Sequence, residues 1–207
     1  AFHSGLITLS SLTLNSQFSE EYLRAILVDT AKGLQKFSDN KTICSNIVAF
    51  LVLAAQTQNV KFSSGLLGSL FAAKGLLREH LRTLGRKYSL IAFAMKLVQG
   101  YFELPVQDKK KMTESFIEVA EHALEQVIKN DKKLDAKVSR ESLLDAFISL
   151  TLKSLLQKES IEDELSSFCS MLRRLFPDVI TETLEKCLNK ARENENYNES
   201  ILKRFVE

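Results

Sequence analysis

The sequence is poor in the residues that break regular structure. Its 207 residues include two prolines, seven glycines and no tryptophan. Strand-rich sandwiches and barrels need frequent glycine and proline turns, and disordered linkers are enriched in proline, so we exclude these classes. The apolar share of 45% and the charged share of 26% are ordinary for a folded protein. A chain of this length can bury a core without disulfides or a structural metal.

Cysteines and long apolar runs are also scarce. The three cysteines, Cys44, Cys169 and Cys187, form an odd set without CxxC spacing, which predicts reduced structural thiols in an intracellular protein. No signal peptide is visible, and the chain begins without methionine, which predicts a segment of a longer protein. The longest uncharged apolar stretch, residues 43–55, is too short to cross a bilayer and predicts a buried helix.

Motifs for catalysis are missing. The sequence contains no HExxH, no GxGxxG, no GxxxxGK[ST] and no GxSxG. The histidines His3, His80 and His122 have no acidic or cysteine partner at ligand spacing, and the pair Glu118 and His122 is typical of an exposed helix face. The acidic group in 159–164 lacks the second ExxH helix of a di-iron bundle. We therefore predict no enzyme, with no catalytic, cofactor-binding or metal-ligating residues, no cofactor and no small-molecule substrate.

Helical periodicity dominates the chain. Apolar residues recur at spacings of three, four and seven, and no stretch alternates polar and apolar residues as a strand would. The pattern predicts an all-α fold of about ten helices, of which the second is capped by Ser19, the third follows Asp39-Asn40 and the fourth begins at Ser63-Ser64. The expected helices are an opening one to residue 15, then 19–37, 41–57, 63–77, 86–102, 108–128, 139–155, 160–175, 177–188 and one from about 198. On the opening helix, the side expected to pack carries Leu6, Ile7, Leu9 and Leu14.

The expected helices recur regularly. Their starts near 19, 41, 64, 86 and 109 predict antiparallel pairs that repeat about every 45 residues. The tetrapeptide Ala-Lys-Gly-Leu at 31–34 returns at 73–76, which favours a repeat. Since one pair cannot bury its apolar face alone, we expect stacked pairs in a single domain over residues 1–207. A division at 104–108 would separate a basic, glycine-containing part (1–104) from an acidic, glycine-free part (105–207).

Helix pairs of this length resemble the HEAT/armadillo-type α-solenoids over essentially the whole chain, although the recurrent proline and the regular turn charges of HEAT repeats are absent. Residues 2–104 are similar to the N-terminal region of the nucleolar, U3 snoRNA-associated HEAT-repeat proteins of the small-subunit processome. The similar features are a leucine-rich opening helix, Glu20-Glu21-Tyr22-Leu23, Lys32-Gly33-Leu34 and the apolar helix after Asp39. The resemblance implies a right-handed α-solenoid that binds proteins, and sometimes RNA, and has no catalytic residues.

Two clusters of cations are candidate contacts for phosphate or for an acidic partner. The first is a basic stripe at a spacing of four residues and the second is a run of three lysines: Lys74, Arg78, Arg82, Arg86 and the adjacent Lys87, then Lys109, Lys110 and Lys111. A solvated helix face is the alternative for the stripe, because cations are favoured in any last helical turn. The lysine run falls at a helix N-terminus, where cations are electrostatically unfavourable, and is harder to explain structurally.

The charge distribution frames the functional hypotheses. Residues 1–104 carry 11 Lys and Arg against 6 Asp and Glu, whereas 105–207 carry 17 against 20.

The leading hypothesis is a non-catalytic protein-interaction scaffold within a multi-subunit complex, in ribosome biogenesis or ribonucleoprotein assembly, with a nuclear or nucleolar location. An RNA-binding α-solenoid that uses the basic first half is one alternative, and a helical enzyme or regulatory domain with an unrecognised pocket is another. We expect proteins as partners before RNA, and no membrane.

Overall fold

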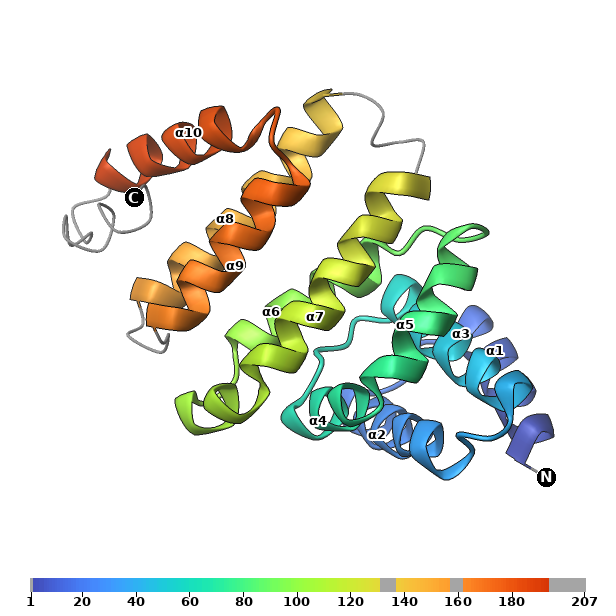
Figure 1. Cartoon of the computed structure of the whole chain (residues 1–207). Coiled ribbons are helices and arrows are strands. Elements are labelled where there is room, and N and C mark those ends of the chain that lie inside the picture. Colours follow the sequence, from blue (N-terminus) through green and yellow to red (C-terminus); the bar gives the residue numbers. More distant parts are fainter. Residues whose placement is uncertain (1, 131–136, 157–161, 194–207) are drawn as a thin grey trace.

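The computed structural model describes residues 2–130, 137–156 and 162–193, and within these ranges the chain forms ten helices and no strand (Figure 1). The all-α prediction is confirmed. The helices are α1 (Phe2–Asn15), α2 (Glu20–Lys36), α3 (Lys41–Thr57), α4 (Ser64–Ala72), α5 (Lys74–Gly85), α6 (Ile91–Phe102), α7 (Val106–Asn130), α8 (Lys137–Leu156), α9 (Glu162–Leu175) and α10 (Ile180–Glu193).

Capping residues fix several helix starts where the sequence predicts them. The Asn40 side chain accepts a hydrogen bond from the Ile43 N–H at 3.1 Å, which begins α3. Ser63 Oγ accepts one from the Leu66 N–H at 3.4 Å, which begins α4. Each bond satisfies a backbone donor that has no partner inside its helix. Ser19 holds the corresponding position before α2 but makes no side-chain cap bond.

The helix expected over 63–77 is divided in two, and the start expected near 86 is wrong. The backbone leaves the helical region at Ala73, with φ −109° and ψ 26°, so that α4 ends there and α5 runs on to Gly85. The nearby Gly75 has low helix propensity, which makes a break in this segment inexpensive. Both halves contact α7, but the break gives them different second neighbours, because α4 also packs on α2 and α6 whereas α5 also packs on α3.

The helices pack in a regular order. From α1 to α8, every helix contacts the helix two places further along the chain. Neighbouring helices also pair, as α2 with α3, α4 with α5 and α6 with α7. The chain thus advances from α1 at one end of the molecule to α10 at the other, and α6 and α7 lie between the two ends (Figure 1).

An aromatic cluster joins α6, α7 and α9. The Tyr101 and Phe116 rings stack with centroids 3.6 Å apart, and Phe168 lies 5.2 Å from Phe102 and 5.6 Å from Phe116. All four side chains are buried. The core therefore continues across the turn between α6 and α7, where the sequence suggests a division at 104–108.

The two described cysteine side chains, Cys44 and Cys169, are both free and lie within helices. Cys44 Sγ donates to the Phe37 carbonyl oxygen at 3.1 Å, and burial raises the pKa of its thiol. Burial raises the pKa of the Cys169 thiol to about 12. Both thiols are protonated at neutral pH and are poor nucleophiles. The Cys187 side chain and the helix expected from 198 lie outside the described residues.

None of the helices in the described ranges combines the length and the apolar character that a membrane span requires. The most apolar candidate from the sequence, residues 43–55, lies within α3 and contributes Ile47, Phe50 and Leu51 to the core.

Candidate binding surfaces

The first half of the predicted basic stripe is held against α7 by one carboxylate. Lys74 Nζ lies 2.7 Å from Glu118 Oε2, and the Arg78 guanidinium pairs with the other oxygen of the same carboxylate. Hydrogen bonding to Lys74 lowers the pKa of the Glu118 carboxyl and raises the pKa of the Lys74 ammonium. Lys74 and Arg78 therefore join α5 to α7, and their charge is partly neutralised before any partner arrives.

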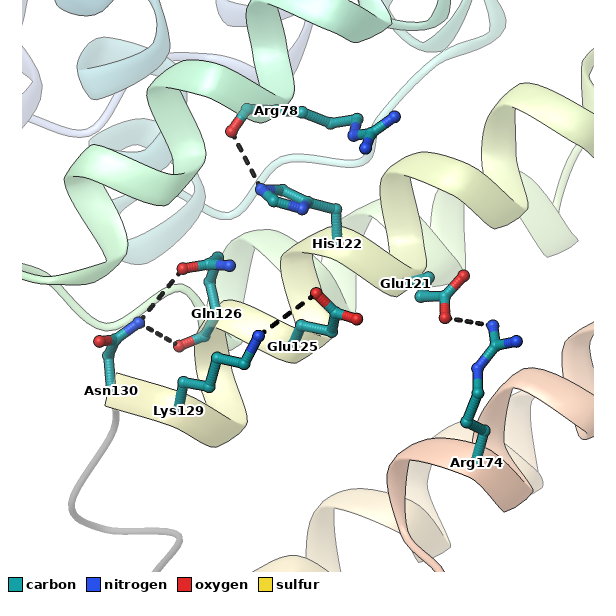
Figure 2. A network of polar contacts seen from close by, with 8 residues as sticks. All are labelled: Arg78, Glu121, His122, Glu125, Gln126, Lys129, Asn130 and Arg174. Carbon is teal, nitrogen blue, oxygen red and sulfur yellow. Dashed lines mark hydrogen bonds and ion pairs between the residues drawn. The ribbon is translucent and has the colours of Figure 1, made fainter.

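The α5–α7 contact continues toward the carboxyl ends of both helices. His122 Nε2 donates to the Arg78 carbonyl oxygen at 3.0 Å, as Figure 2 shows. A Cβ atom built at Gly85 would lie 3.1 Å from the Gln126 Cβ, so the end of α5 approaches the end of α7 closely. Contacts thus advance along both helices in the same direction, and α5 and α7 are parallel. On its other side α7 binds α9, through an ion pair between Glu121 and Arg174 (Figure 2).

The second half of the stripe lies at the surface. Arg82, Arg86 and Lys87 are exposed, and no ion pair joins any of them to another residue in the part of the chain that the structure describes. Arg86 keeps helical backbone angles at the end of α5, so it lies one turn beyond Arg82 on the same side. Tyr88 follows, with 57% of its surface exposed. We call Arg82, Arg86, Lys87 and Tyr88 the α5-end surface.

The turn that carries this surface is well fixed. The N–H groups of Lys87 and Tyr88 both donate to the Leu84 carbonyl oxygen, at 2.8 and 2.9 Å. Gln56 Nε2 donates to the Ser89 carbonyl oxygen at 2.6 Å and ties the end of the turn to α3. The three cations also face the negative end of the α5 dipole, which alone would favour them here.

The structure separates the lysine run of 109–111. Lys109 is fully buried, with its ammonium 5.8 Å from the centroid of the Phe102 ring, at the distance of a cation–π contact. Lys110 and Lys111 are exposed near the start of α7. With a rise of 1.5 Å per residue, Lys111 lies about 22 Å along α7 from Gln126, which adjoins the end of α5. The two predicted clusters therefore do not form one surface.

A surface on α1 is absent from the sequence-based candidates. We expected Ile7 and Leu14 on the packed side, but this is wrong, because their exposed fractions are 57% and 61%. The helix rotates by about 100° per residue, so burying Leu6 against α3 turns Ile7 and its neighbour two turns on, Leu14, toward solvent. Ser4 and Ser11, on the same side, are exposed as well. We call Ile7, Leu14, Ser4 and Ser11 the α1 surface.

The α1 surface is unusually low in polarity. α1 contains no Asp, Glu, Lys or Arg, and His3 is its one ionisable side chain. The hydroxyl groups of Thr8, Ser10 and Thr13 donate to carbonyl oxygens one turn earlier in the same helix, at 2.7 to 3.1 Å. Of these three, only Thr8 is exposed, and its donor is already used. Ile7 and Leu14 supply the apolar part of the α1 surface, and the hydroxyl groups of Ser4 and Ser11 supply its polar part.

Two histidines on the α5–α7 pair predict a loss of stability at acidic pH. Burial lowers the pKa of His80 and of His122 from the ordinary 6.5. At His122 the hydrogen bond to the Arg78 carbonyl oxygen opposes this lowering of the pKa, and the charges of Arg78 and Arg82 add to it. The two imidazoles therefore bind protons more tightly in the unfolded chain than in the folded one. Their contribution to the free energy of unfolding is fully present above pH 6.5, and it is lost as the pH falls through 6.5 toward their lower pKa values in the folded state. We expect the urea midpoint to be lower at about pH 5.5 than at about pH 7.5.

The variant carrying His80→Leu and His122→Gln should lose most of this pH dependence. His3→Gln, at the exposed third histidine on α1, is the control and should leave it unchanged. The Glu118 carboxyl does not contribute in this window, because its pKa lies below the ordinary 4.5. An undiminished pH dependence in the double variant would contradict the assignment to these histidines.

The described residues contain few other groups that could bind a metal ion or react. No group of three His, Cys, Asp or Glu side chains in those ranges has the arrangement of a metal site. Among the described residues, His80 Nε2 is buried without a hydrogen-bond partner, and the charges of Glu79 and Lys41, which pair with each other, act on its ring.

Comparison with known proteins adds no relative. No protein-family model, no curated protein and no solved structure matches this chain. The fold is therefore established as all-α with packed helix pairs, and the HEAT/armadillo resemblance stays a prediction.

Proposed function

We propose that the chain is a non-catalytic protein-docking segment, built as a right-handed α-solenoid of antiparallel helix pairs in the HEAT/armadillo manner. The observation that carries the proposal is the α1 surface, an exposed helix face without Asp, Glu, Lys or Arg on a chain of packed helices. The resemblance to processome proteins makes ribonucleoprotein assembly in the nucleus the expected setting.

The order of helix contacts supports the solenoid arrangement. In stacked antiparallel pairs, each helix packs in parallel on the helix two places along. Three pairs have this register. In the first pair, residues 3 and 13 of α1 bond to residues 46 and 58 at α3. In the second, residues 78 and 85 of α5 adjoin residues 122 and 126 of α7. In the third, residues 116 and 121 of α7 adjoin residues 168 and 174 of α9.

An elongated shape is the expected consequence of this arrangement. A compact globule of 207 residues has a radius of gyration of about 17 Å. Stacked pairs should give a clearly larger value by small-angle X-ray scattering, and a value near 17 Å would contradict the solenoid.

The α1 surface supports protein docking rather than catalysis. Exposed apolar positions on a helix without Asp, Glu, Lys or Arg are suited to contact with another apolar surface, because few charged groups must be desolvated. Four of the six exposed large hydrophobic residues in the described ranges lie on this one helix: Phe2, Ile7, Leu12 and Leu14.

The docking function predicts that Ile7→Lys with Leu14→Lys removes partner binding. Burying two ammonium groups in an apolar interface is costly, so we expect at least a tenfold loss of affinity. The partner is first captured from nuclease-treated nuclear extract on the immobilised chain, then purified and titrated. The nuclease removes proteins that are held only through RNA.

Tyr22→Lys is the matched control, since Tyr22 is an isolated exposed aromatic residue on α2. This control should bind the partner as the unaltered chain does, and all three proteins should share one thermal midpoint. Equal loss of binding in both variants, or retention in both, would place the interface elsewhere.

A further inference from the structure

The α5-end surface has features that neither helix packing nor protein docking through α1 uses. Three cations lie within about one and a half turns of chain, without an ion pair in the described residues, and they adjoin an exposed aromatic ring. In the first half of α5 and in α7 from Glu118 onward, cations are matched by carboxylates: Lys74 and Arg78 by Glu118, and Lys129 by Glu125. The local positive charge is concentrated where the two helices end.

We infer that the α5-end surface binds single-stranded nucleic acid. Arg82 and Arg86, one turn apart on the same side of α5, are placed to contact successive backbone phosphates. Lys87 adds a third charge, and Tyr88 offers a ring on which a base can stack. Cations that follow the backbone, together with an aromatic platform, are the usual elements of sequence-tolerant single-strand binding.

The helix dipole accounts for cations at the end of α5, but it does not account for Tyr88. A phenol ring gains nothing from the dipole, and in a folded chain a large aromatic side chain is stabilised by burial. Here the turn is held by two bonds to the Leu84 carbonyl oxygen, and it keeps the ring exposed beside the charges. An acidic peptide would need only the cations, so the ring favours nucleic acid over an acidic protein segment.

The site is already formed in the free chain. Leu84 fixes the backbone of Lys87 and Tyr88, and Gln56 holds Ser89. A ligand would therefore have to order only the long side chains of Arg82, Arg86 and Lys87, and the entropy lost on binding is limited to these. The surface lies at the end of α5 and in the turn that follows, and it shares no residue with the α1 surface.

The test measures fluorescence anisotropy of a short labelled RNA of mixed sequence, and of DNA of the same sequence, with the whole chain. We expect binding of at least one of the two that weakens with salt, with a slope of about −2 in log affinity against log salt for three phosphate contacts. Binding of RNA alone would identify the ribose hydroxyl as part of the recognised chemistry.

Two variants assign the binding to this surface. Arg82→Glu with Arg86→Glu should lower affinity at least 100-fold and bring the salt slope close to zero. Tyr88→Ala should lower affinity about tenfold at an unchanged salt slope, and Tyr88→Phe should restore it, because the ring rather than the hydroxyl stacks. Arg78 is left unaltered, because it holds Glu118.

The matched control is Lys110→Glu with Lys111→Glu, which changes the net charge equally at the far end of α7. It should bind nucleic acid as the unaltered chain does, and Ile7→Lys with Leu14→Lys should also leave this binding intact. If the chain failed to bind nucleic acid, the docking proposal would be unaffected. If the chain failed to bind a protein through α1, the nucleic-acid inference would be unaffected. No binding of RNA or DNA, an equal loss in the lysine control, or binding of an Asp/Glu-rich peptide in place of nucleic acid would overturn the inference.

Discussion

Gly100→Ala should destabilise the chain by about 3 kcal/mol, because the added methyl group has no room. A Cβ atom at this buried position of α6 would lie 2.6 Å from the Phe62 carbonyl oxygen and 2.8 Å from the Phe62 Cβ. The obstacle includes backbone and cannot rotate aside. Phe62 belongs to the segment between α3 and α4, which Lys96 also holds, by donating to the Val60 carbonyl oxygen at 2.7 Å. Either this segment or α6 must therefore move.

The measurement is the urea midpoint of Gly100→Ala beside that of Gly75→Ala. Gly75 lies in the first turn of α5, and a Cβ atom there would meet no other atom within 4 Å. Alanine at this position should be neutral or raise stability by up to about 1 kcal/mol, because it narrows the unfolded ensemble and favours helix. Equal effects of the two substitutions would show that the close approach of α6 to Phe62 is not rigid.

Local signals in the sequence are sufficient for most helix boundaries. The caps at Asn40 and Ser63 act within four residues, so they can be recognised without knowledge of the fold. Helical periodicity likewise needs only neighbouring residues, and it predicts the all-α class and α1, α2 and α3 within a few residues.

The break at Ala73 could not be predicted in this way. The apolar stripe continues in phase from α4 to α5, and the choice between one helix and two depends on which partners the halves find. The repeated tetrapeptide Ala-Lys-Gly-Leu also shows that local sequence does not determine where a helix ends. Its first copy lies inside α2, where a Cβ at Gly33 would be 2.9 Å from Ile47, and its second copy spans the break, where Gly75 is open. Identical local sequences thus occupy different environments.

Which residues form the candidate binding surfaces depends on tertiary contacts even more strongly than the helix boundaries do. A spacing of four placed Lys74, Arg78, Arg82 and Arg86 in one stripe, but only the packing of α7 decides which of them meet a carboxylate. Glu118 lies 40 residues from Arg78, and its role has no local signal. The burial of Lys109 and the exposure of Ile7 likewise follow from which side of each helix its neighbours cover.

Gln58→Ala should cost about 3 kcal/mol or more, because one buried amide serves three backbone groups. Gln58 follows the last residue of α3 and is 4% exposed. Its Nε2 donates to the carbonyl oxygens of Thr13 and Ser16, at 2.8 and 2.9 Å, and its Oε1 accepts from the Phe18 N–H at 3.1 Å. The side chain therefore binds both the end of α1 and the connection to α2. Without it, polar groups at the α1–α3 contact lose their partners.

Two further substitutions distinguish the hydrogen bonds from the volume that the side chain fills. Gln58→Met keeps a similar size but forms none of the three bonds, so it should be nearly as unstable as Gln58→Ala in urea unfolding. Gln56→Ala, two residues earlier, removes an exposed amide with a single bond to the Ser89 carbonyl oxygen and should cost at most about 1 kcal/mol. Recovery of stability in Gln58→Met would show that packing holds α1 on α3. Loss in both Gln58 variants, with Gln56→Ala close to the unaltered chain, would assign the contact to the buried amide.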